Sequence, residues 1–298
     1  MKMILLGTGT SHGVPVVACQ CKVCTSTDER DRRMRCAAFV TGPASILIDT
    51  GPEFRMQALR FGVTQPDAVL ITHSHADHLN GLDDLRIFSH TEAVDPSRPE
   101  LVATEGEGLP IYANANTIED IKNRFDYIFK PVKEGGGKPK LKLVDCAAYT
   151  ADNPLRVGGM DIFPVPLLHG TLADSGWLLC ERHTDGGVHS IAYLTDCNKV
   201  PDASLGLVRS RAGILEHLVI DGLRMEPHST HFSFAEALSV AERLQPVHTW
   251  LTHLTHDNSH AELHGCLCGL LEQFPLLQDI VRRGGSVEAA YDGLILET

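Results

Sequence analysis

The stretch Ala68-Val-Leu-Ile-Thr-His-Ser-His-Ala-Asp-His-Leu-Asn-Gly-Leu82 is the part of the sequence from which the fold can be inferred. Its first five residues are apolar or β-branched, which predicts a buried strand. Leu79, Leu82 and Leu85 then follow at helical spacing, so we expect the strand to turn directly into a helix. Between the two lie four side chains of the types that bind metal ions: His73, His75, Asp77 and His78.

We expect these four side chains to meet in one small volume. Strand alternation directs His73 and His75 to the same side of the chain, and the turn into the helix brings the other two toward them. Imidazole and carboxylate ligands suit zinc, manganese or iron, and too many converge here for one tetrahedral ion. We therefore predict two adjacent divalent ions, zinc or manganese, bridged by a hydroxide in a hydrolytic site. The alternative is a helix N-terminus capped by Asp77 and surrounded by surface histidines. This alternative gives no structural reason for so many ligand-type residues in so short a segment.

The composition predicts one folded domain in the cytoplasm. Of the 298 residues, 43% are hydrophobic and 21% are charged, as in typical soluble globular proteins. No apolar run approaches the length of a membrane span, and residues 1–7 indicate a first strand rather than a signal peptide. We therefore expect a single hydrolase domain over residues 1–298 that is not bound to a membrane.

The formal charge of −12 argues against nucleic acid and anionic membranes as partners. A small phosphorylated substrate remains compatible with this charge, because bound cations would reverse the local field. The oligomeric state stays open at this stage, a homodimer included.

A second group of ligand-type residues lies in the segment Cys19-Gln-Cys-Lys-Val-Cys24. Nine cysteines in a cytoplasmic chain indicate reduced thiols or metal ligation rather than disulfides. Cys19, Cys21 and Cys24 would suit a structural zinc ion, which needs one more ligand from elsewhere. His256 is the candidate, since it follows His253 by three residues and points elsewhere if the chain is extended there. The alternative is three loop thiols without metal.

The remaining pattern alternates strands and helices. A hairpin is expected over residues 37–40 and 45–48, and Asp49 after it would either anchor a liganding histidine or cap a helix. Loops are expected over residues 100–108 and over the basic, glycine-rich residues 130–140. Further strands are predicted over residues 109–113, 141–144, 161–165, 177–180, 190–194, 217–220 and 249–252. Helices are predicted over residues 52–61, 117–129, 233–244 and 261–274. A final hairpin is predicted over residues 289–296, with its turn at Asp292-Gly293.

The spacing H-x-H-x-D-H at residues 73–78 resembles the signature of the metallo-β-lactamase superfamily. This resemblance implies an α/β fold, a four-layer αββα sandwich with its metals at one edge between two sheets. It also implies a later His, Asp and His, and His169, Asp196 and His253 stand in that order at the ends of predicted strands. The implied ligand sets are His73, His75 and His169 for one ion and Asp77, His78 and His253 for the other, with Asp196 bridging the two.

A closer resemblance combines the motifs G-T-G-T-S-H-G-V-P, C-x-C-x-x-C, H-x-H-x-D-H and T-H-L-T-H between Met3 and His256. Together they resemble the phosphoribosyl 1,2-cyclic phosphate phosphodiesterases of the carbon–phosphorus lyase pathway. The resemblance implies hydrolysis of a small cyclic phosphodiester with two active-site metals. It further implies two catalytic residues, Asp77 and the general acid His231, for which a structural place at a helix entry is the alternative. Residues 91–141 form a longer segment than the family core.

Three other functions remain open from the sequence. An RNA-processing endonuclease of the same superfamily is one, although the acidic balance and the lack of a long basic arm speak against it. A non-hydrolytic protein resembling pyrroloquinoline quinone biosynthesis protein B is another, but in that family the H-x-H-x-D-H motif is degraded and here it is intact. A thioester or lactone hydrolase is the third.

Overall fold

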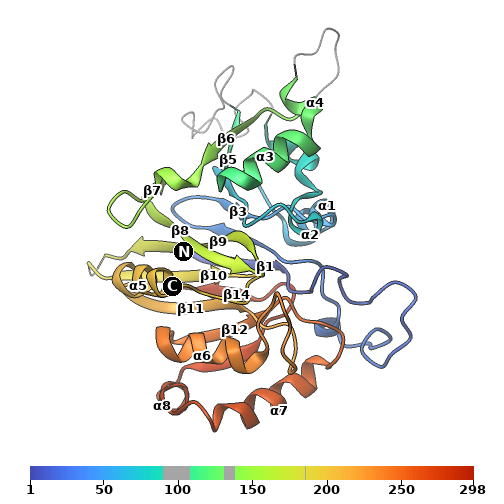
Figure 1. Ribbon diagram of the computed structural model, residues 1–298, viewed down its shortest axis with the longest axis vertical. Coiled ribbons are helices and arrows are strands. Elements are labelled where there is room, and N and C mark those ends of the chain that lie inside the picture. Colours follow the sequence, from blue (N-terminus) through green and yellow to red (C-terminus); the bar gives the residue numbers. More distant parts are fainter. Residues whose placement is uncertain (90–107, 131–137, 185) are drawn as a thin grey trace.

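The computed structural model describes residues 1–89, 108–130, 138–184 and 186–298, which form two seven-stranded sheets (Figure 1). In spatial order, the first sheet contains β14 (Ile295–Glu297), β1 (Lys2–Gly7), β2 (Ala37–Thr41), β3 (Ile46–Ile48), β4 (Ala68–Leu70), β5 (Leu109–Ala113) and β6 (Leu141–Asp145). The second contains β13 (Ser286–Ala289), β12 (His248–Thr252), β11 (Ile214–Asp221), β10 (Val188–Leu194), β9 (Leu172–Arg182), β8 (Met160–His169) and β7 (Leu155–Val157).

Both sheets have the same order of strand pairings. In the first sheet, three antiparallel pairings from β14 to β3 are followed by three parallel pairings from β3 to β6. In the second, three antiparallel pairings from β7 to β10 are followed by three parallel pairings from β10 to β13. The carboxyl ends of parallel strands are where open α/β sheets place ligand sites, so each sheet offers such an edge.

The alternation of buried side chains along the strands separates three layers of core. On β4, Ala68 and Leu70 pack between the two sheets, whereas Val69 packs outward against helices. The space between the sheets is filled by large side chains that include Trp177 and Tyr193, both fully buried. Because each sheet is apolar on both faces, each needs a layer of helices on its outer side.

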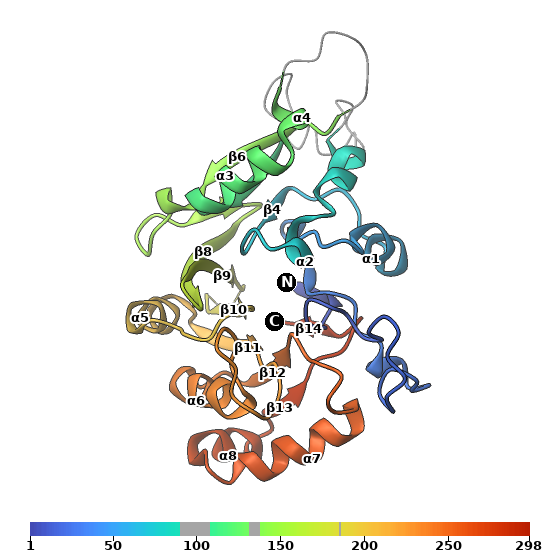
Figure 2. The ribbon, with the colours of Figure 1, turned by 45° about the vertical axis from the view of Figure 1, so that its right-hand side comes forward.

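Figure 2 shows these outer helical layers on opposite sides of the paired sheets. The first sheet is covered by α1 (Phe54–Phe61), α2 (Ala76–Leu79), α3 (Ala115–Arg124) and α4 (Asp126–Phe129). The second is covered by α5 (Asp202–Arg211), α6 (Phe234–Leu244), α7 (His260–Leu271) and α8 (Pro275–Arg282). Short 3₁₀ turns occur at Glu29–Asp31, Leu82–Phe88 and Cys146–Ala148. This order of layers confirms the predicted αββα sandwich.

Several elements differ from their predicted lengths. The helix expected after the metal motif is a single turn, α2, followed by the 3₁₀ turn. The break between them allows Gly81 to approach the backbone so closely that a Cβ there would lie 2.2 Å from the Gly51 carbonyl oxygen. The helix predicted over residues 117–129 is divided into α3 and α4 at Phe125. Helices α5 and α8 were not predicted.

The predicted final hairpin is wrong. The strand β13 pairs with β12 in the second sheet, whereas β14 pairs with β1 in the first, so the Asp292-Gly293 turn carries the chain from one sheet to the other. Asp292 is half-buried, and its carboxylate accepts hydrogen bonds from Thr8 Oγ1 at 2.8 Å and Met34 N at 2.7 Å. A turn signal specifies a local reversal but not which sheet the next strand joins.

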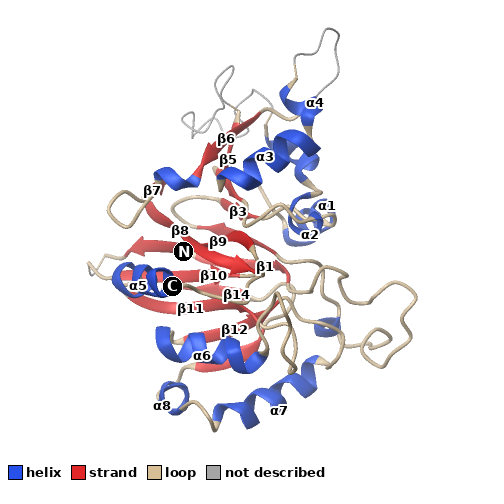
Figure 3. Cartoon of the chain, in the orientation of Figure 1, coloured by secondary structure: helices blue, strands red, loops and turns tan. Residues whose placement is uncertain are grey.

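Two predicted loops lie largely outside the described residues, because residues 90–107 and 131–137 are not among them. The described part of the long segment 91–141 contains β5, α3 and α4. Within the described chain, no helix combines the length and the apolarity that a membrane crossing requires. Figure 3 shows that residues 8–36 run mostly as loop along one side of the molecule, near α7.

Candidate metal centre

His73, His75 and His169 form the first group of converging side chains. His73 follows β4 and is buried, while His169 ends β8 in the opposite sheet. The ring centroids are 4.6 Å apart for His73 and His75, and 5.0 Å apart for His75 and His169. One nitrogen of each ring lies within 4.8 Å of the others, so the three rings could hold one ion.

Asp77, His78, Asp196 and His253 form the second group, with their ligand atoms also within 4.8 Å of one another. Asp196 Oδ2 lies 3.1 Å from His78 Nε2 and 3.2 Å from His253 Nε2. The same oxygen lies 3.8 Å from His73 Nε2 of the first group. Asp196 is therefore placed between the two groups, as its expected bridging role requires, and the grouping is the one implied by the family resemblance.

An unusual backbone conformation at the strand ends sets the direction of the Asp49, Asp196 and His253 side chains. Asp49, Asp196 and His253 have φ of 62°, 54° and 60°, in the left-handed region that non-glycine residues adopt at a cost. Asp49 directly follows β3 and His253 directly follows β12, while Asp196 lies two residues beyond the end of β10. Each of these strands takes part in a parallel pairing. The left-handed step turns the chain sharply there, and the surrounding packing offsets the strain.

A surrounding set of hydrogen bonds orients the rings. His78 Nδ1 donates to Asp49 Oδ2 at 2.7 Å, so of the two roles expected for Asp49 the structure shows the contact with a histidine of the ligand group. Asp49 also accepts from the backbone and hydroxyl of Thr72, at 2.8 and 2.9 Å. His169 Nδ1 donates to the Thr230 carbonyl at 2.8 Å. With Nδ1 occupied in this way, Nε2 of each ring is left to face the centre.

Asp174 is a site residue that the sequence did not reveal. It lies near the start of β9, is buried, and has its Oδ1 3.9 Å from His73 Nδ1. Burial, and next the charge of Asp196, raise the pKa of Asp174 well above its ordinary value. No ligand spacing or strand-end position marks it, and it reaches the centre only because the second sheet packs over β4.

Orphaned polar atoms show that the site fits cations. Nε2 of His73, His78 and His253 are buried without a hydrogen-bond partner among the described residues, as is Oδ2 of Asp174. Buried polar atoms are normally satisfied, and a divalent ion is a partner that would satisfy these nitrogens. Identities of the ions do not follow from these ligands, which suit zinc and manganese alike.

The pKa shifts of the charged side chains also indicate that the site fits cations. Burial alone would raise the pKa of Asp196, but His253 and His78 hold it well below its usual range. Burial alone would lower the pKa of His78, but Asp196 and Asp49 raise it well above its usual range. The buried carboxylates thus create a negative field in which positive charge is stabilised, as a cation site requires.

His231 lies beside both groups. Its ring centroid is 4.6 Å from that of His169 and 4.5 Å from that of His253, and the rings of His231 and His253 are stacked. His231 Nδ1 donates to Asp221 Oδ2 at 2.7 Å. Asp221 ends β11 and also accepts from the Cys197 backbone N–H at 2.8 Å, so the carboxylate is itself fixed. The sequence placed Asp221 at a strand end but did not connect it with His231.

The cysteine group also assembles as expected. His256 Nδ1 lies 3.5, 3.4 and 3.3 Å from the sulfurs of Cys19, Cys21 and Cys24. A tetrahedral zinc ion with bonds of about 2.3 Å to sulfur and about 2.0 Å to nitrogen separates such atoms by about 3.5 Å. The Cys24 backbone N–H and the His256 ring lower the pKa of Cys21 to about 6, which favours the thiolate that a metal binds. The four side chains therefore fit a structural zinc ion.

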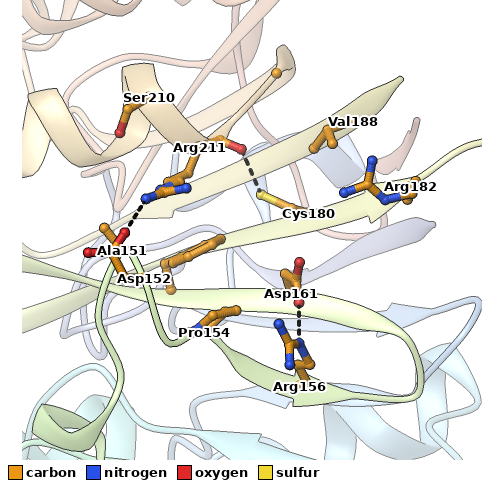
Figure 4. Close-up of a pocket in the computed structure, with 12 residues that line it drawn as sticks. Ala151, Asp152, Pro154, Arg156, Asp161, Cys180, Arg182, Val188, Ser210 and Arg211 are labelled. Atoms are coloured by element: carbon orange, nitrogen blue, oxygen red, sulfur yellow. Dashed lines mark hydrogen bonds and ion pairs between the residues drawn. The ribbon is translucent and has the colours of Figure 1, made fainter. Parts of the chain in front are cut away.

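A separate cavity of about 410 Å³ opens at the other end of the second sheet (Figure 4). Three arginines line it, but Arg156 pairs with Asp161 and Arg211 with Asp152, at 3.2 and 2.7 Å. This cavity contains none of the residues of the two metal-ligand groups, so we do not assign the chemistry to it.

Comparison with known proteins agrees with this geometry. Residues 44–254 match the model of a family described as the beta-lactamase superfamily domain. A crystal structure described as a new diphosphatase from the PhnP family aligns with 100% of this chain and 97% of its own, with a TM-score of 0.75 and 34% sequence identity.

Two curated relatives carry other names. A protein of Porphyromonas gingivalis named octanoyltransferase is 35% identical over 268 residues, which are 89% of this chain. The match covers 47% of that relative, so this chain spans about half of its length. Coenzyme PQQ synthesis protein B of Methylobacterium nodulans is 31% identical over 258 residues, a match that covers 66% of this chain and 85% of that protein.

Proposed function

Since this chain belongs to the beta-lactamase superfamily, whose model matches residues 44–254, we propose that it hydrolyses a phosphodiester in a small molecule, such as the cyclic phosphate of phosphoribose. The coarser statement, a metal-dependent hydrolase, follows from the family and from the two groups of ligand atoms. The finer one is supported by the residues beside those groups.

The chain would hold two cations through side chains that are already oriented. His73, His75 and His169 would hold one ion, and Asp77, His78 and His253 the other, with Asp196 reaching both. Such a pair supplies positive charge for phosphate oxygens and a nucleophilic water at neutral pH. The hydrogen bonds from Asp49 and the Thr230 carbonyl keep the His78 and His169 rings in place without rearrangement during the reaction.

The pairing of His231 with Asp221 is the observation that carries the proposal. Asp221 occupies Nδ1 of His231, and one ring nitrogen of His231 lies within 4.8 Å of ligand-type atoms of His169 and Asp196. We expect the remaining nitrogen, Nε2, to serve the leaving group. A proton on that nitrogen can be given to the oxygen that leaves phosphorus. A departing alkoxide needs such a proton, whereas a departing thiolate does not, because a thiol ionises near pH 8.5. An oriented general acid therefore favours phosphodiesters over thioesters.

Diphosphate hydrolysis is the second candidate. It is supported by the diphosphatase of the PhnP family, which is 34% identical over nearly the full length of both chains. In both reactions a phosphorus–oxygen bond breaks, and a proton at the leaving oxygen assists its departure. The two differ in whether the leaving group is an alcohol or a phosphate.

A substrate panel tests the proposal. The purified protein, reconstituted with Mn²⁺ or Zn²⁺, would be assayed on phosphoribosyl 1,2-cyclic phosphate, bis(p-nitrophenyl) phosphate, a dinucleoside diphosphate, octanoyl thioester and precursor tRNA. We expect turnover of the cyclic phosphodiester, with a phosphate monoester as product. Turnover of the dinucleoside diphosphate alone would favour the second candidate, and turnover of the thioester or the RNA alone would refute both.

A further inference from the structure

Figure 4 shows the cavity of about 410 Å³ on the outer face of the second sheet, beside the last turn of α5. Phe163 and Cys180 line it and belong to the core cluster on this face. Because side chains alternate along a strand, Asp161 on β8 and Arg182 on β9 point to the same face. Strand register places Asp161 opposite Cys180, and Arg182 opposite Val188 on β10. Three neighbouring strands therefore build the floor of the cavity.

The end of α5 forms a wall of this cavity and is fixed to the sheet. Gly213 follows the helix with a φ of 61°, and a Cβ there would lie 2.2 Å from the Val188 carbonyl oxygen. The Cys180 thiol donates to the Arg211 carbonyl at 3.6 Å. The wall therefore stays in place without a ligand. The volume is within the range of about 300–1,000 Å³ that is typical of sites for small molecules.

The charged residues that line the cavity are three arginines and two aspartates. Arg156 pairs with Asp161, and their side chains are 75% and 40% exposed. Arg211 pairs with Asp152, and their side chains are 38% and 93% exposed. Exposed pairs of this kind contribute little to stability, so an anionic ligand can replace the carboxylates.

The third arginine, Arg182, has no ion-pair partner among the described residues. It ends β9, on the side of the cavity where Val188 lies (Figure 4). The chain has 38 Asp and Glu against 26 Lys and Arg, so an arginine without a carboxylate beside it is not what the composition favours. The cavity thus has a net positive charge in an acidic protein, and one of its guanidinium groups is free to bind an anion.

The lining of the cavity suits three kinds of chemical group. Phe163, Val188 and Pro154 offer an apolar surface on which a flat ring can pack. The carboxylates of Asp152 and Asp161, once released from their arginines, accept hydrogen bonds from hydroxyl groups. A phosphate monoester carries a charge of about −1.5 to −2 at pH 7, and a guanidinium binds two of its oxygens at once. A ring, hydroxyl groups and a phosphate occur together in a nucleoside monophosphate.

We propose that this cavity binds a nucleoside monophosphate, with the phosphate on Arg182, the base on the apolar floor and the ribose hydroxyls toward the two aspartates. This site is separate from the metal centre. Asp161 is the second residue of β8 and His169 is the last, so the two sites are about 26 Å apart along this strand. The inference therefore does not depend on the proposed function, and either one can fail without the other.

Calorimetry tests the binding. AMP, GMP, CMP and UMP would be titrated into the purified, Mn²⁺-loaded protein, with adenosine, inorganic phosphate and benzoate as ligands that each carry only part of the chemistry. We expect at least one nucleotide to bind about tenfold or more tightly than each partial ligand. Arg182→Gln should weaken this binding by about tenfold or more. Arg182→Lys should lose less, because an ammonium keeps the charge but not the planar donors.

Two further variants show where the nucleotide binds. Arg55→Gln is the matched control, because Arg55 is exposed on α1 over the first sheet and also has no ion-pair partner among the described residues. This variant should keep the wild-type affinity. His75→Ala removes a candidate metal ligand, and the affinity for the nucleotide should stay within about twofold of the wild type if the cavity is the site.

Three results would overturn the proposal. One is a loss of affinity in His75→Ala but not in Arg182→Gln, which would place the nucleotide at the metal centre. Another is an affinity for all four nucleotides no greater than that for phosphate, adenosine and benzoate. The third is an equal loss in Arg182→Gln and Arg55→Gln, which would reduce the effect to the overall charge of the protein.

Discussion

At the scale of single residues, His231 shows how position creates chemical function. It is one of sixteen histidines, and like His78, whose Nδ1 pairs with Asp49, it has one ring nitrogen held by a buried carboxylate beside the metal-ligand groups. His189 has a comparable partner, with its Nδ1 2.8 Å from Glu216, but its ring stacks on His183 and not on any residue of the metal-ligand groups. The carboxylate alone therefore does not make a general acid.

Replacing His231 by alanine should keep the metals and slow the reaction. We expect kcat to fall by about 10²- to 10⁴-fold for a substrate with an alkyl leaving group, because the alkoxide then departs without a proton. For a p-nitrophenyl ester the loss should stay below about tenfold, since that leaving group is a weak base. Rates on the two substrates and metal content by mass spectrometry are the measurements. His189→Ala is the control, and equal losses on both substrates or loss of metal would exclude the role.

Asp292 predicts a pH dependence of stability. Burial raises the pKa of this carboxyl from 3.8 to about 7. The protonated form therefore stabilises the fold below about pH 4, and this stabilisation, on the order of 4 kcal/mol, is lost as the pH rises to about 7. Asp292→Asn stays neutral and should not lose it. Urea unfolding at pH 5 and pH 8 should show the variant gaining on the wild type by more than half of that amount, and a constant difference between them would contradict the assignment.

At the scale of elements, the site depends on the residues at the carboxyl ends of the parallel strands. His73, Asp196, Asp221 and His253 stand at or within three residues of the ends of β4, β10, β11 and β12, and α2 continues the first of these turns with Asp77 and His78. The short α2 is held by close backbone approaches, since a Cβ on Gly51 would lie 2.1 Å from the Asp77 carbonyl oxygen. The ligands on α2 are thus positioned by the backbone of a neighbouring turn.

Gly51→Ala should therefore displace α2. We expect a destabilisation of about 1–3 kcal/mol from overpacking and a lower occupancy of the ion that Asp77 and His78 would hold. Gly265→Ala on α7 is the matched control, because its Cβ would meet nothing within 4 Å. That change should stabilise the helix by up to about 1 kcal/mol and leave metal content unchanged. Thermal unfolding and metal analysis distinguish the two, and full metal occupancy in Gly51→Ala would show that α2 does not depend on this approach.

At the scale of the whole molecule, the cysteine group joins distant parts of the chain. Cys19, Cys21 and Cys24 lie in the long N-terminal loop, and His256 lies just after β12 in the second sheet. The same loop contacts α7 through the ion pair of Lys22 with Glu262. A zinc ion here would close a loop of more than two hundred residues next to His253, so it would stabilise the chain near the active site.

Cys24→Ser should remove one equivalent of zinc and lower the melting temperature. We expect a decrease of about 5–10 °C, corresponding to a few kcal/mol in a chain of this size. Cys268→Ser serves as the control, because Cys268 is exposed on α7 and lies outside the cluster. Metal analysis with differential scanning calorimetry provides the readout. Unchanged zinc in Cys24→Ser would leave the three thiols without a structural ion.

The amino-acid sequence by itself determined the elements and the ligand types. An apolar, β-branched run predicted the strand before His73, and similar runs predicted the strands that lead to His169, Asp196 and His253. These signals are local, because side-chain periodicity is set by the backbone geometry of a strand or helix. Asp49 and His256 were also inferred from short-range spacing, and the structure brings both to the expected partners.

Only the tertiary structure decided which distant residues support the site. Asp174 carries no local signal, and Asp221 was placed at a strand end without its partner His231; both lie close to the ligand groups because β9 and β11 belong to the second sheet, which packs over the first. The left-handed backbone at Asp196 and His253 likewise exists only where surrounding packing offsets its strain. The crossing of the chain between the two sheets at Asp292 was mistaken for a hairpin for the same reason: a turn residue specifies the reversal, whereas the partner of the next strand is set by packing across the whole fold.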